Sequence, residues 1–131
     1  MSRFLTGHQV NPADDRLKIE VLDQPGSGGA HHRYEITGFN AATNASNAYP
    51  GGYIGAEVLF QNGPIGEVGV NGITHEALLA ILIDRLECFQ SGPYHSPYNQ
   101  DALSALQFAQ RRLLDRTRER TARNVEGTHT V

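Results

Sequence analysis

The sequence has one cysteine and no long run of apolar residues. The first argues against a disulfide-stabilised protein and the second against a membrane-spanning one. Cys88 has no partner for a disulfide within the chain, so we expect a reducing compartment such as the cytoplasm. It lies in an apolar helical run, which predicts a buried, inert thiol. No window approaches the roughly 20 apolar residues of a membrane span, and the first residues lack the apolar core of a signal peptide. We therefore expect no membrane association.

Residue types that carry catalytic or metal chemistry are present but form no motif. The six histidines do not have the spacing of zinc ligands, and His31 and His32 would point to opposite faces of a strand. The glycine-rich segment 26–29 lacks the lysine of a phosphate-binding loop and precedes no predicted helix. We identify no activated nucleophile and no pair of catalytic carboxylates. The sequence therefore predicts no catalytic residue, no metal site and no cofactor.

Charge is distributed unevenly along the 131 residues, whose net charge is -3. From Asn99 onward, six arginines and four carboxylates give +2, which leaves -5 for the preceding part of the chain. This asymmetry predicts an anionic partner at the C-terminal end.

The length fits a single domain, which we expect to comprise a β-rich part, residues 1–70, and a helical part, residues 71–131. Apolar alternation bounded by turn-forming residues predicts strands. The predicted strands are residues 17–22, 32–39 and 53–61, with residues 65–70 returning antiparallel to the third. The predicted fold class is α+β, a small antiparallel N-terminal β-sheet followed by a C-terminal antiparallel two-helix hairpin.

The first helix of this hairpin is expected to begin after Thr74, whose hydroxyl can cap the free N–H groups of the first turn. Apolar spacings of three and four predict a broad buried face, and Ser91-Gly92-Pro93 ends the helix. A second helix is expected from near Asn99, and the short connection makes the two helices antiparallel. The predicted buried stripe comprises Leu78, Ile81, Leu82, Arg85, Leu86 and Phe89.

Arginines recur along one side of the second predicted helix at a spacing of four. Guanidinium forks suit phosphate because two parallel N–H groups can reach two oxygens. The alternative is a solvent-exposed helix face held by ion pairs such as Arg111 with Asp115. The stripe contains Arg112, Arg116 and Arg120, with Arg123 close to the same face.

A second candidate group lies at the tip of the hairpin. Phe89, Tyr94 and Tyr98 could offer a stacking face to a base, and Asn99 could bond a base edge or a ribose. Phe89 could equally be the last core residue of the first helix. Asn99 could equally be the N-cap of the second helix.

Four blocks of sequence resemble, in order and spacing, the Thoeris anti-defence family of phage proteins. The resemblance extends from about Val58 to Thr128, with departures at Pro97-Tyr98 and Gln110–Arg112. The four blocks are Leu59–Ile65, Gly69–Leu78, Arg85–Tyr94 and Arg116–Thr128.

The resemblance implies a sponge and not an enzyme. Family members bind cyclic ADP-ribose isomers, such as glycocyclic ADP-ribose, made by bacterial TIR proteins, and hold them intact in the cytoplasm of the infected host cell. Some also bind cyclic trinucleotides of the CBASS pathway, and the implied assembly is a homodimer within a hexamer. The residues that match the family's ligand contacts are Phe89, which stacks on adenine, with Asn99, Arg116 and Arg120.

Helix geometry independently separates these four residues. At about 1.5 Å of rise per residue, Asn99 and Arg116 lie roughly 25 Å apart along one helix, so a shared pocket needs two antiparallel chains. Two other functions remain open, a small nucleic-acid-binding regulator and an enzyme that cleaves the cyclic signal. The acidic first part of the chain, and Asp115 and Glu119 within the basic stretch, argue against nucleic acid.

Overall fold

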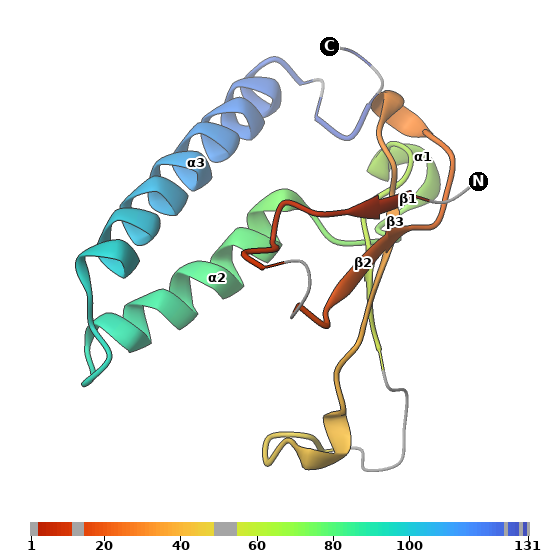
Figure 1. Cartoon of the computed structure of the whole chain (residues 1–131). Helices are drawn as coiled ribbons and strands as arrows, with labels where there is room; N and C mark the ends of the chain where they lie inside the picture. The colour runs from red at the N-terminus through yellow and green to blue at the C-terminus, as the bar shows by residue number, and fades with distance from the viewer. Residues whose placement is uncertain (1–2, 12–14, 49–54, 125, 129, 131) are drawn as a thin grey trace. The chain divides into compact units, whose positions relative to one another are not determined.

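The computed structural model of the chain describes residues 3–11, 15–48, 55–124, 126–128 and 130. The chain divides into two compact units, Met1–Asn62 and Gly63–Val131. The first unit contains a β-sheet and the second contains helices (Figure 1). The predicted α+β class is confirmed.

The first unit is a four-stranded antiparallel sheet in which neighbours in sequence are neighbours in space. Its register places Glu20 opposite Glu35, and Glu35 opposite Glu57, so one face of the sheet carries a row of carboxylates. Val21, on the other face, is only 1% exposed. The strands are β1 (Arg3–Leu5), β2 (Lys18–Val21), β3 (Arg33–Thr37) and β4 (Ala56–Leu59).

Strands β2, β3 and β4 confirm the three predicted strands, with shorter bounds, although residues 53 and 54 of the third prediction lie outside the described residues. The prediction that residues 65–70 return as a strand is wrong. Ile65–Val68 form the short helix α1, which follows Pro64 and is closed by Gly69. Gly69 has φ 78°, a left-handed conformation that suits glycine at a helix end and would interrupt a strand.

Asp23 fixes the turn between β2 and β3. Its carboxylate accepts hydrogen bonds from the backbone N–H groups of His32 at 2.9 Å and Arg33 at 3.1 Å. Partial burial acts to raise the pKa of Asp23, but these two N–H donors and the nearby His31 outweigh it and lower the pKa below its usual range.

The second unit is built on α2 (His75–Gln90) and α3 (Pro97–Ala122), which pack against each other. Thr74 caps α2 as predicted, since its hydroxyl accepts from the N–H of Ala77 at 3.1 Å. The N-cap of α3 is Ser96, followed by Pro97 at the first helical position, where the missing N–H costs nothing.

The side chain of Gln90 ties the end of α2 to the start of α3. Its oxygen accepts from the N–H of Ser96 at 3.0 Å, and its amide nitrogen donates to the Ser96 carbonyl at 3.2 Å. The turn between the helices is therefore held at both ends, which confirms the predicted hairpin. Within the described parts of the chain, no helix has both the length and the apolar character to cross a membrane.

Candidate functional site

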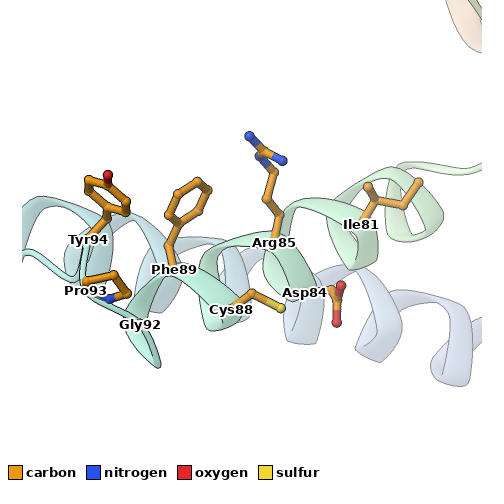
Figure 2. A pocket seen from close by; sticks show the side chains of 8 residues that line it. All are labelled: Ile81, Asp84, Arg85, Cys88, Phe89, Gly92, Pro93 and Tyr94. Atoms are coloured by element: carbon orange, nitrogen blue, oxygen red, sulfur yellow. The ribbon is translucent and has the colours of Figure 1, made fainter. Parts of the chain in front are cut away.

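A pocket of about 490 Å³ lies on α2 and the turn that follows it. Every residue that lines it comes from these two segments, so the pocket opens on a side of the hairpin to which α3 contributes nothing (Figure 2). The lining is mainly apolar and contains one carboxylate and one guanidinium. Its residues are Ile81, Asp84, Arg85, Cys88, Phe89, Gly92, Pro93 and Tyr94.

Phe89 stands at the centre of this lining, half-buried, with its ring toward the pocket. Arg85 lies one helical turn earlier, and its guanidinium carbon is 5.1 Å from the centre of the Phe89 ring. Arg85, Phe89 and Tyr94 project from the same side of α2 and its turn (Figure 2). The hairpin therefore presents an aromatic surface with a cation beside it.

Asn99 lies at the same end of the hairpin but does not have the capping role that its position allowed. It is the third residue of α3, and its backbone N–H donates to the Ser96 hydroxyl at 3.1 Å. Its side-chain nitrogen donates to the carbonyl of Tyr94 at 3.3 Å. Asn99 thus fixes the turn that carries Tyr94, and the helix cap is Ser96.

Arg116 and Arg120 lie toward the other end of α3. Arg116 is exposed and forms no hydrogen bond or ion pair within the described part of the chain. Arg120 is only 6% exposed. Its guanidinium bonds Glu126 at 3.2 Å and the carbonyls of Thr128 and Thr130, all in the segment after α3, which we call the tail.

The predicted arginine stripe is therefore not uniform. Arg112 and Arg118 both pair with Asp115, at 3.3 and 3.7 Å. The exposed-face alternative expected Arg111 to pair with Asp115, and it does not. Its guanidinium carbon instead lies over the ring of Phe108, 5.5 Å from the ring centre. Arg123 pairs with Glu119 at 3.0 Å. Of the four arginines in the stripe, Arg116 alone has no such contact to described residues.

Two expectations about burial are wrong. Cys88 is exposed and lines the pocket, so it is not a buried thiol. Ile81 and Leu82, in the predicted buried stripe, are 64% and 41% exposed. The apolar residues of α2 extend over a wider arc than one neighbouring helix can cover, and the outer part of this arc forms the pocket wall.

The sequence interpretation also missed Arg85 as a candidate site residue and treated it as a member of the apolar stripe. The signal that could have identified it is its position four residues before Phe89, which places the two side chains on one helix face.

As for metals, the described residues contain no group of three His, Cys, Asp or Glu side chains arranged to hold an ion.

Comparison with known proteins finds similarity to a phage anti-defence protein. No protein-family model matches the chain. Over 74 residues, 56% of this chain, it is 45% identical to Thoeris anti-defense 1 of Bacillus phage SBSphiJ7. The match confirms the resemblance to the Thoeris anti-defence family. The matched residues make up 52% of that relative, so the chain spans about half the length of the relative that it matches.

Proposed function

We propose that this protein is a phage anti-defence sponge that binds a TIR-derived cyclic ADP-ribose isomer, glycocyclic ADP-ribose, without degrading it. Sequestering the signal would block Thoeris immunity, in keeping with the name of the similar phage protein. The observation that carries the proposal is the open aromatic pocket at Phe89. A flat ring in an open pocket suits a nucleotide because it offers a stacking face for the base.

The proposed site contains Phe89 and Asn99 from one chain, and Arg116 and Arg120 from a second, antiparallel chain. About 25 Å separates Asn99 from Arg116 along α3, which is too far for one nucleotide to join them within a hairpin. A two-fold dimer would form two equivalent pockets, each with a hairpin tip facing the arginines of its partner. We further propose that such dimers assemble into a hexamer.

Exposed apolar side chains on the hairpin support self-association. Ile81 is 64% exposed and Leu82 is 41% exposed. These side chains belong to consecutive residues of α2, and a second copy of the hairpin would cover them.

Nucleic acid is the less well supported ligand. Arg112, Arg118 and Arg123 already pair with carboxylates of their own helix, so α3 offers little free positive charge to a phosphate backbone. Weak binding of duplex DNA that is insensitive to salt would agree with this view.

The test measures binding of glycocyclic ADP-ribose by calorimetry and then identifies the ligand released on denaturation by mass spectrometry. Wild type should bind and release intact ligand, whereas a cleavage product would point to an enzyme. Phe89→Ala should lose stacking worth about 1–3 kcal/mol. Arg116→Gln should lose a charge-assisted contact worth about 1.5–3 kcal/mol.

Two matched controls accompany these variants. Phe108→Ala removes another exposed aromatic beside an arginine, and Arg118→Gln removes another exposed arginine of α3. Neither control should alter affinity. Site variants that bind like these controls would remove the site assignment. A cyclic trinucleotide belongs in the same ligand panel, since the family resemblance implies that such ligands also bind.

A further inference from the structure

The guanidinium of Arg85 is held at the pocket by an aromatic ring. Its central carbon lies 5.1 Å from the centre of the Phe89 ring, and both side chains come from the same face of α2 (Figure 2). Arg85 is exposed, and within the described residues it forms no hydrogen bond or ion pair. Its N–H donors are therefore available to an incoming acceptor, while contact with the ring restricts where the side chain lies.

Most other arginines of the helical unit have partners that compensate their charge. Arg112, Arg118 and Arg123 pair with carboxylates, and Arg120 bonds Glu126 and the carbonyls of the tail. Asp84 lines the same pocket as Arg85 but forms no ion pair with it or with any other described residue. The pocket thus holds a cation that has no ion-pair partner among the described residues and lies 5.1 Å from the centre of its stacking ring.

We infer that Arg85 is an additional ligand-binding residue, one that binds a phosphate of the nucleotide whose base stacks on Phe89. This inference rests on the proposed function and specifies how a single chain contributes to it. The base would stack on the Phe89 ring, and the phosphates, one ribose away, would reach past the edge of the ring to the Arg85 fork. Arg85 would then make the pocket prefer phosphate-bearing ligands over nucleosides with the same base.

The chain offers a matched control for Arg85. Arg111 also lies over an aromatic ring, 5.5 Å from the centre of Phe108, but neither residue lines the pocket. Arg85→Gln and Arg111→Gln therefore each remove one charge and one cation–π contact, and only the first does so at the proposed site. Arg85→Lys keeps the charge but loses the planar fork.

Binding of glycocyclic ADP-ribose and of adenosine is measured for wild type and these variants in the full chain. Arg85→Gln should weaken glycocyclic ADP-ribose binding by about 10- to 100-fold and leave adenosine binding within about twofold. Arg85→Lys should fall between wild type and Arg85→Gln, and Arg111→Gln should match wild type.

Three other results are possible, and each would contradict a different part of the proposal. If Arg85→Gln binds glycocyclic ADP-ribose as tightly as Arg111→Gln does, Arg85 is not a ligand residue, and the proposed function stands. If it weakens adenosine equally, Arg85 only positions Phe89, and the phosphate contact is wrong. If wild type binds no glycocyclic ADP-ribose, the proposed function itself fails.

Discussion

At the scale of single residues, some apolar and aromatic side chains of α2 pack against α3, and others are exposed. Phe89 was open to two interpretations from sequence, a core residue or a stacking platform. In the structure it is half-buried and lines a pocket beside Arg85 and Tyr94, so the geometry permits stacking. Cys88 is exposed beside it for the same reason, because α3 covers only one side of α2.

The carboxylate of Asp23 predicts how the stability of the fold depends on pH. Because two backbone N–H groups stabilise its charged form in the fold, its pKa is lower in the folded chain than in the unfolded chain. The resulting stability is present above the unfolded pKa, near pH 4, and is lost as the pH falls through the folded pKa. Asp23→Ala should therefore lower the melting temperature at pH 7.

The difference in melting temperature between wild type and Asp23→Ala should narrow at pH 3, below the unfolded pKa, because the stability that depends on the charge of Asp23 is lost as the pH falls toward the folded pKa. Thermal unfolding followed by far-UV circular dichroism at the two pH values measures this. An equal difference at both values would mean that the bonds from His32 and Arg33 do not depend on the charge of Asp23.

At the scale of elements, the tail is the feature that most affects the proposed site. It supplies the acceptors for the buried Arg120, and the carbonyl of its Gly127 accepts from the N–H of Gly66 at 3.1 Å. For Arg120 to contact a ligand as the family resemblance implies, its bond to Glu126 has to be exchanged for one to a phosphate.

Removing that competitor should strengthen binding. Glu126→Ala is expected to bind glycocyclic ADP-ribose up to about tenfold more tightly, the value of one charge-assisted hydrogen bond at its lower limit. Glu119→Ala is the control, because Glu119 also pairs with an arginine near the end of α3. Weaker binding by Glu126→Ala alone would show that the tail supports the site instead of competing for it.

Local chemistry explains which elements could be predicted. Thr74 could be identified because a cap depends on neighbouring residues only. Strand β1, Arg3–Leu5, was missed because three residues are too short to establish an alternation. The contacts of Arg120 could not be predicted, since they depend on a segment that folds back onto α3. Likewise, periodicity shows which residues share a face of α2, but not how much of that face a neighbour covers.

At the scale of the whole molecule, the proposed pocket is shared between chains, and mixing variants tests this directly. A dimer of one Phe89→Ala chain and one Arg116→Gln chain has one pocket with both defects and one with neither. Refolding the two variants together at equal amounts should therefore restore tight binding to about a quarter of the sites, provided that chains pair at random.

Each variant alone should show no tight sites in the same titration, and sedimentation should report a dimer or a larger assembly. A monomer that binds with full affinity, or a mixture no better than its components, would contradict the two-chain pocket.

The separation of Asn99 from Arg116 along α3 also has a genetic consequence. If each pocket draws on two copies of the chain, as proposed, two phages with different defective alleles would complement each other during co-infection of one cell. An allele that retains dimerisation but has lost both halves of the site would instead be dominant, since it would inactivate the pockets of every normal chain with which it pairs.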